Sequence, residues 1–141
     1  MTKFRELFPG IWLGPQPAYE DLSELEGQGV EAVIDFRMPS ETLSSNAELT
    51  KRHGFSYINI PLSRDNPDPD AVEELDQALN NQPGPYLLHC GSGIRAITIY
   101  LLREAKRQGW SAEQVENEAK ERGFDLTGAP GLLRLTRDYL A

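Results

Sequence analysis

The sequence predicts an α/β fold in which a mostly parallel central sheet of four or five strands lies between layers of helices. Short strand-like segments alternate along the chain with longer amphipathic, helix-like segments, which is the pattern of βαβ units. Residues 32–36 and 86–89 are largely apolar, as strands buried on both faces of a parallel sheet are. With 141 residues the chain is long enough to bury a core, and we expect one domain over residues 1–141.

The first half of the chain contains three predicted strands and two predicted helices. Residues 11–14 form a short apolar strand, residues 32–36 form a buried strand, and residues 55–60 form a strand that a proline closes. The predicted helix over 18–28 ends before a glycine, and the one over 40–53 begins at a serine that can cap it. The apolar face of the first helix consists of Tyr19, Leu22 and Leu25.

The second half contains one predicted strand and four predicted helices. Residues 69–81 have apolar side chains at helical spacing, and residues 86–89 form a strand. Residues 93–108 follow as a helix with a long apolar stripe. Two further amphipathic segments, 111–122 and 131–140, predict the last helices. Ligands of such folds bind at the carboxyl ends of the strands, so residues after 89 are expected at the site.

Composition and charge exclude several classes of function. The formal net charge is −8, and such a chain repels nucleic acids and anionic membranes, so neither is an expected partner. No apolar run is long enough to span a bilayer and the first residues lack the features of a secretory signal, which predicts a cytoplasmic protein. The chain has one cysteine, which excludes an internal disulfide and a two-thiol redox cycle and disfavours a cysteine-based zinc site.

The candidate chemistry lies in the loop that follows the strand over 86–89. Two glycines allow successive backbone N–H groups to point at one centre, and the start of the next helix adds partial positive charge. The arginine of the loop can grip two oxygens of a bound anion. A thiolate in such a cradle can attack a bound oxyanion and form a covalent intermediate. The loop consists of Cys90, Gly91, Ser92, Gly93, Ile94 and Arg95.

A buried free cysteine at the end of a core strand is the alternative interpretation of Cys90, because cysteine is often buried. The preceding strand, the glycines, Arg95 and the amphipathic helix together favour a nucleophile instead.

The segment from His89 to Arg95 resembles the His-Cys-(five residues)-Arg signature of the cysteine-dependent protein tyrosine phosphatases. Residues 8–17, 29–37 and 58–62 resemble, in the same order, segments of the dual-specificity branch of that superfamily. The resemblance implies a tyrosine-phosphatase-like fold without a metal or other cofactor. It assigns Cys90 as nucleophile and Gly91, Ser92, Gly93, Ile94 and Arg95 as the residues that bind the substrate's phosphate.

Two departures from the signature bear on this resemblance. Only four residues separate Cys90 from Arg95, as in a bacterial group of phosphatase-like proteins whose relatives include domains fused to metallo-β-lactamase-like hydrolases. The same loop length occurs in rhodanese-type sulfurtransferases, whose cysteine carries a persulfide. The phosphatases place Ser or Thr after the arginine, whereas this chain has Ala96, with Thr98 as a weak substitute, so hydrolysis of a phosphocysteine is expected to be slow.

A phosphatase needs a general acid to protonate the leaving oxygen, and related enzymes use an aspartate upstream of the cysteine. Asp65 is the predicted acid, because it is nearest the end of the preceding strand, and Asp68 is the second choice. Asp70 is expected to cap or start the next helix. His89 is expected to support the thiolate through a hydrogen bond to backbone near the loop, as the resemblance implies, rather than to transfer a proton.

Asp35 and Arg37 flank one residue at the end of a strand and therefore point to the same side. Arg37 could pair with Glu41, and we interpret this pair as structural.

Three functions remain open at this point. The first is a phosphomonoester hydrolase of the tyrosine or dual-specificity phosphatase type, which acts on a phosphorylated protein or a small phosphomonoester through a phosphocysteine. The second is a rhodanese-type sulfurtransferase that carries a persulfide on Cys90, and the third is a non-catalytic anion-binding module.

Overall fold

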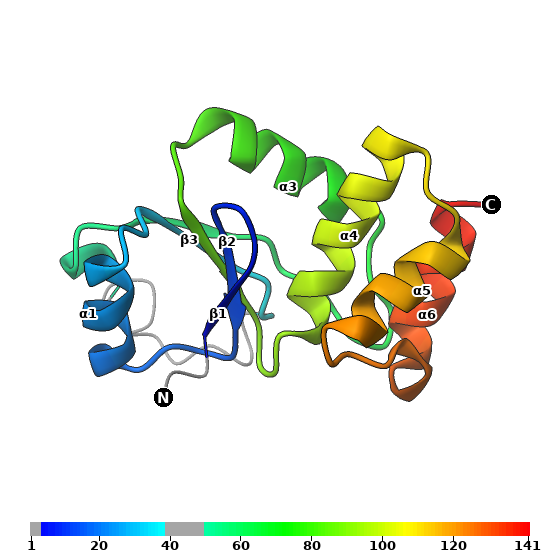
Figure 1. The fold of residues 1–141 in the computed structure, drawn as a ribbon, viewed down its shortest axis with the longest axis horizontal. Helices are drawn as coiled ribbons and strands as arrows, with labels where there is room; N and C mark the ends of the chain where they lie inside the picture. The colour runs from blue at the N-terminus through cyan, green and yellow to red at the C-terminus, as the bar shows by residue number, and fades with distance from the viewer. Residues whose placement is uncertain (1–3, 39–49) are drawn as a thin grey trace.

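In the computed structural model, which describes residues 4–38 and 50–141, five strands form one sheet (Figure 1). The strand order is β1-β2-β5-β3-β4, with β1 antiparallel to β2 and the other neighbours parallel. The fold is therefore α/β with a mostly parallel sheet, as predicted. The strands are β1 (Arg5–Phe8), β2 (Ile11–Gly14), β3 (Ala32–Asp35), β4 (Ser56–Asn59) and β5 (Tyr86–His89).

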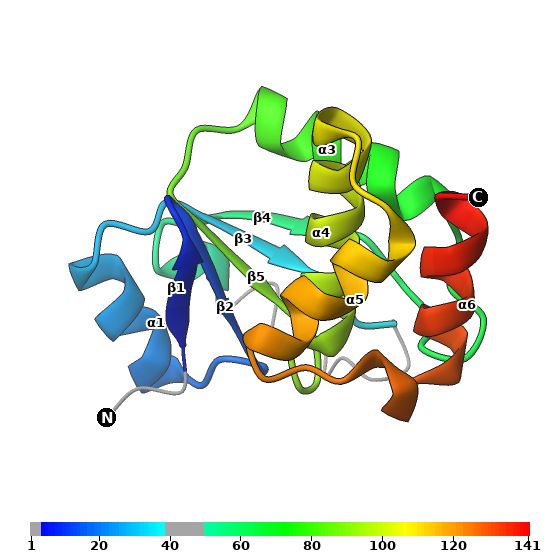
Figure 2. The same ribbon diagram turned by 45° about the vertical axis from the view of Figure 1, so that its right-hand side comes forward.

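Helices cover both faces of the sheet. Helix α1 lies on one face, while α3, α4, α5 and α6 gather on the other (Figures 1 and 2). The helices are α1 (Tyr19–Gly27), α3 (Asp70–Asn81), α4 (Ile94–Gln108), α5 (Ala112–Glu121) and α6 (Pro130–Tyr139), with the short 3-10 helix η2 (Leu126–Gly128) before α6.

Helix α4 is the centre of the larger core. It packs against β5, α3, α5 and α6, so residues on all of its sides are buried, including Arg95 and Thr98 in its first turns. A smaller core between the sheet and α1 contains Leu22 and Leu25 together with Phe4. The first turn of α4 thus begins inside the larger core, directly after β5.

The predicted elements agree with the structure within one or two residues wherever the structure describes them. The predicted helix over 40–53 lies mostly outside the described residues. Of the three residues expected on one face of the first helix, Leu22 and Leu25 are buried, whereas the Tyr19 side chain is 58% exposed. Strand β1 was missed because its two leading residues are charged; a turn with Gly10 in the left-handed region (φ 77°) pairs it with β2.

No helix among the described residues is long and apolar enough to cross a membrane.

Candidate active site

Four residues from neighbouring strands lie in one row at the carboxyl edge of the sheet. His89 of β5 is in register with Gly14 of β2 on one side and Asp35 of β3 on the other, and Asp35 is in register with Asn59 of β4. Cys90 follows this row immediately, so the sheet delivers the cysteine to the edge where ligands of parallel α/β folds bind.

Within the loop from Cys90 to Arg95, one backbone N–H group is aimed at the sulfur. The N–H of Gly93 donates a hydrogen bond to Cys90 Sγ across 3.0 Å, and Cys90 is fully buried. Gly93 has φ 103°, a left-handed conformation that strains residues with a Cβ atom. A Cβ atom at Gly93 would also lie 3.2 Å from the Phe124 ring, so the ring would have to shift to accommodate it.

Arg95 links the cysteine loop to the acidic loop at residues 62–70. It lies in the first turn of α4, is 7% exposed, and its Nη1 donates a hydrogen bond of 3.0 Å to the carbonyl oxygen of Leu62. Its Nη2 would be 3.5 Å from a Cβ atom at Gly91, so the guanidinium group lies against the cysteine loop. Of the other loop residues, Gly91 and Ser92 are exposed and Ile94 is buried.

The two candidate acids differ in their surroundings, although both are exposed. Asp68 Oδ1 accepts a hydrogen bond of 2.9 Å from the N–H of Asp70, the first residue of α3, so Asp68 serves the start of that helix. The main-chain oxygen of Asp65 accepts a hydrogen bond of 3.1 Å from Arg134 of α6. The structure thus joins the acidic loop to the site at Leu62, three residues before Asp65.

His89 is fully buried beneath the cysteine loop. Its Nδ1 lies 3.8 Å from Asp35 Oδ1, and among the described residues neither ring nitrogen has a hydrogen-bond partner within 3.5 Å, so the expected hydrogen bond from His89 to the loop backbone is not formed within that distance. Burial lowers the pKa of His89 from 6.5 to about 4, and Arg37 acts in the same direction, while Asp35 and the Cys90 backbone partly oppose the shift. The imidazole is therefore neutral at pH 7.

Asp35 is the centre of a buried polar network. Its carboxylate accepts hydrogen bonds from the Arg37 N–H (2.9 Å), from Arg37 Nε (3.2 Å) and from the Tyr57 hydroxyl (2.7 Å). Burial raises the pKa of Asp35, but His89, the Arg37 amide, Tyr57 and the Arg37 side chain together bring it below 3.8. Because His89 is neutral at pH 7, Arg37 and Tyr57 are the groups that stabilise the carboxylate there.

Sequence reasoning missed several members of this network. Arg37 also donates to Gln16, and the side-chain amide of Asn59 donates to the main-chain oxygens of Asp35 (2.7 Å) and Arg37 (3.1 Å). The signal for Asn59 was its position at the end of a strand beside the strand of Asp35. The predicted partner of Arg37, Glu41, lies outside the described residues.

The residues after Arg95 are poorly suited to stabilise the Cys90 thiolate as it leaves a phosphocysteine. Ala96 is fully buried, and the buried hydroxyl of Thr98 donates a 2.7 Å hydrogen bond to the carbonyl oxygen of Ile94 in its own helix. Thr98 is thus engaged in α4, which weakens its interpretation as a substitute for the missing Ser or Thr. Within residues 4–38 and 50–141, no group of three His, Cys, Asp or Glu side chains is arranged to hold a metal ion.

Comparison with known proteins places the chain among relatives of known family and fold. The chain is similar to a "Beta-lactamase hydrolase-like protein" of Agrobacterium fabrum, with 29% identity over 124 residues, which is 84% of this chain and 29% of the relative. The chain therefore spans less than a third of that curated relative's length.

Solved structures with the same fold include Tk-PTP in its active form, with a TM-score of 0.81 and 15% identity over 97% of this chain and 95% of that one. They also include P. aeruginosa TpbA in complex with pTyr, with a TM-score of 0.78 and 17% identity over 96% of this chain and 83% of that one.

Residues 3–107 match the family described as "Beta-lactamase hydrolase-like protein, phosphatase-like domain". The matched segment runs from β1 into the last turn of α4 and contains the whole cysteine loop. The chain therefore belongs to this family of phosphatase-like domains.

Proposed function

We propose that the chain is a cysteine-dependent phosphomonoesterase that acts through a phosphocysteine on Cys90. The observation that carries the proposal is the 3.0 Å hydrogen bond from the Gly93 N–H to Cys90 Sγ, in a loop against which the Arg95 guanidinium lies. Backbone N–H groups together with an arginine are the usual partners of a phosphoryl group, and here one such N–H group lies beside the sulfur that would attack phosphorus.

The reaction has two steps. In the first, Cys90 Sγ attacks phosphorus, an S–P bond forms, and the P–O bond to the leaving group breaks while Arg95 and the loop amides hold the other oxygens. Asp65 protonates the leaving oxygen as it takes the electron pair. In the second, water attacks phosphorus and gives a proton to the Asp65 carboxylate, the S–P bond breaks with its electron pair returning to the Cys90 thiolate, and phosphate is released.

Asp65 is preferred over Asp68 as the general acid. The carboxylate of Asp68 is occupied at the start of α3, whereas the contact between Leu62 and Arg95 holds the segment with Asp65 beside the cysteine loop. His89 supports the loop as a neutral, buried side chain and does not transfer the proton. The second step is slow, because Ala96 offers no hydroxyl and that of Thr98 is bonded to Ile94.

The substrate we propose is a single phosphomonoester, on a phosphorylated protein or a small molecule. The chain has a net charge of −8 and no lysine in the cysteine loop, which disfavours a substrate with several phosphates. A complex of the similarly folded TpbA with pTyr supports the same substrate class.

A sulfurtransferase is the second candidate, and the four-residue spacing between Cys90 and Arg95 is the observation that favours it. In that reaction Cys90 attacks the sulfane sulfur of thiosulfate, sulfite leaves, and cyanide then accepts the sulfur as thiocyanate. No general acid is needed, so substitution of Asp65 would leave this activity unchanged.

The test is turnover of p-nitrophenyl phosphate and of thiosulfate with cyanide, each with the parent protein and Cys90→Ser. We expect phosphate release that falls about 10⁴-fold or more in the variant. Thiocyanate formation that depends on Cys90, without phosphate release, would replace the proposal with the sulfurtransferase. Anion binding without either turnover would indicate the non-catalytic module.

A further inference from the structure

The first turn of α6 touches the main chain of the acidic loop at Asp65. A Cβ atom at Gly131 would lie 2.4 Å from the carbonyl oxygen of Arg64 and 2.6 Å from that of Asp65. Real Cβ atoms do not approach oxygen this closely, so any larger residue at this position would push the loop away from α6. Gly131 therefore allows the Asp65 peptide to lie directly on the helix.

Two arginine side chains hold the same short stretch of the loop. Arg134, one turn after Gly131, donates from Nη2 to the main-chain oxygen of Asp65 across 3.1 Å. Arg64 donates from Nη2 to the main-chain oxygen of Gly128 in η2 across 3.4 Å. With the bond from Arg95 to Leu62, the loop is attached just before and at Asp65.

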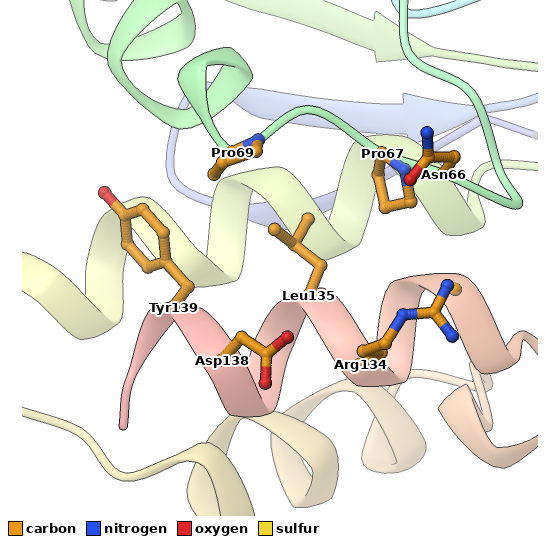
Figure 3. Close-up of a pocket in the computed structure, with 8 residues that line it drawn as sticks. Asn66, Pro67, Pro69, Arg134, Leu135, Asp138 and Tyr139 are labelled. Atoms are coloured by element: carbon orange, nitrogen blue, oxygen red, sulfur yellow. The ribbon is translucent and has the colours of Figure 1, made fainter.

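Beyond Asp65 the loop separates from α6. A cavity of about 450 Å³ lies between the following loop residues and the later turns of the helix (Figure 3). Figure 3 shows Arg134 on α6 near Asn66 and Pro67, with Leu135, Asp138 and Tyr139 further along the helix. The contacts that fix the loop are therefore concentrated at Arg64 and Asp65. The cavity is lined by Asn66, Pro67, Pro69, Gly131, Arg134, Leu135, Asp138 and Tyr139.

We propose that Gly131 and Arg134 are positioning residues that fix the Asp65 peptide and thereby aim its carboxyl group at the leaving oxygen. This inference rests on the proposed phosphatase function and on Asp65 as its acid. Neither residue acts on the substrate directly; both act through the main chain of Asp65. Both also lie after residue 107, outside the segment that matches the family.

The chemistry offers a readout that a general loss of structure would not change. When the P–O bond breaks, the electron pair goes to the leaving oxygen, and a poor leaving group needs the Asp65 proton most. Phenol has the pKa of a tyrosine side chain, about 10, whereas p-nitrophenol is far more acidic and needs less protonation. The ratio of kcat/KM for p-nitrophenyl phosphate to kcat/KM for phenyl phosphate therefore reports how well the acid is placed.

The experiment measures this ratio for Arg134→Ala and Gly131→Ala, with a matched control for each. Arg137→Ala is the control for Arg134, because Arg137 on the next turn contacts Glu116 of α5 and not the loop. Gly27→Ala is the control for Gly131, because a Cβ atom there meets nothing within 4 Å and Gly27 ends α1, outside the contacts of the acidic loop. The variant Asp65→Asn gives the reference ratio for an enzyme that lacks its general acid.

We expect Arg134→Ala to lower kcat/KM for phenyl phosphate about five- to tenfold and to raise the ratio toward that of Asp65→Asn. Gly131→Ala should change the ratio in the same direction, and both controls should keep the parent ratio. In the Asp65→Asn background, Arg134→Ala should have no further effect on the ratio, because the group it positions is gone.

If Asp65→Asn raised the ratio but Arg134→Ala and Gly131→Ala both left it unchanged, this inference would be overturned. The proposed function and Asp65 as its acid would not be affected. If Asp65→Asn instead kept the ratio of the parent protein, Asp65 would not be the general acid, and the inference would fail with it. The quantity kcat/KM ends at the first irreversible step, so slow hydrolysis of the phosphocysteine does not mask these outcomes.

Discussion

The two loops that meet at the candidate site are held in different ways. The cysteine loop lies between β5 and the central helix α4, and Cys90, Gly93 and Arg95 are all buried. Residues 64–66 of the acidic loop are exposed, and this loop is attached through main-chain oxygens to arginines. We infer that changes in the cysteine loop affect stability and chemistry together, whereas changes in the acidic loop affect chemistry alone.

The largest effect on stability is expected from His89, the buried support of the cysteine loop. Its pKa in the folded protein, about 4, is below the 6.5 of the unfolded chain, so the unfolded chain binds a proton first as the pH falls. The stability that comes from keeping His89 neutral is fully present above pH 6.5 and is lost as the pH falls toward 4. The loss corresponds to about 3 kcal/mol of unfolding free energy.

Chemical denaturation at pH 7 and pH 4.5 measures this effect. The variant His89→Asn should show a smaller loss of unfolding free energy between the two pH values than the parent. Equal losses in the parent and His89→Asn would show that another group causes the pH dependence.

A smaller effect is expected from Gly93→Ala in the same loop. The substitution places a Cβ atom on a backbone with φ 103° and within 3.2 Å of Phe124, which should lower the free energy of unfolding by about 2 kcal/mol. Phosphatase turnover should fall as well, because the Gly93 N–H that bonds to Cys90 Sγ moves with the strained peptide. Gly109→Ala provides a control at a left-handed glycine with open space around it, far along α4.

The smallest effect on stability is expected from Asp65→Asn in the acidic loop. Asp65 is exposed, so the free energy of unfolding should change by less than about 0.5 kcal/mol. Turnover of phenyl phosphate should nevertheless fall about 10²-fold, because the leaving oxygen loses its proton donor. A large loss of stability in this variant would contradict the proposed separation between the two loops.

The same contrast explains how much of the site could be predicted from the sequence. Cys90, Gly93 and Arg95 are neighbours in the chain, so their spacing and the strand before them predicted the loop. The contact of Arg134 with Asp65 joins residues 69 positions apart, and no local pattern indicates it. The bond from Tyr57 to Asp35 likewise joins residues 22 positions apart and depends on the register of β3 and β4.

The fold was easier to predict from the sequence than these contacts, because hydrophobic periodicity can be recognised within a few consecutive residues. Apolar runs predicted the parallel strands within one or two residues, whereas the charged start of β1 did not indicate a strand. The exposure of Tyr19 could not be predicted either, because helical spacing shows which residues share a face but not how far the rest of the protein covers that face.

Three arginines hold the acidic loop and its support, and each binds a main-chain oxygen: Arg95 that of Leu62, Arg134 that of Asp65, and Arg64 that of Gly128. A carbonyl oxygen is present whatever residue carries it, so these hydrogen bonds do not depend on the side chains of Leu62, Asp65 or Gly128. Loop side chains other than those of Arg64 and Asp65 can therefore change in evolution, or be randomised in a library, while the arginines still hold the backbone. This loop is therefore a suitable place to introduce variation when selecting variants that act on new substrates.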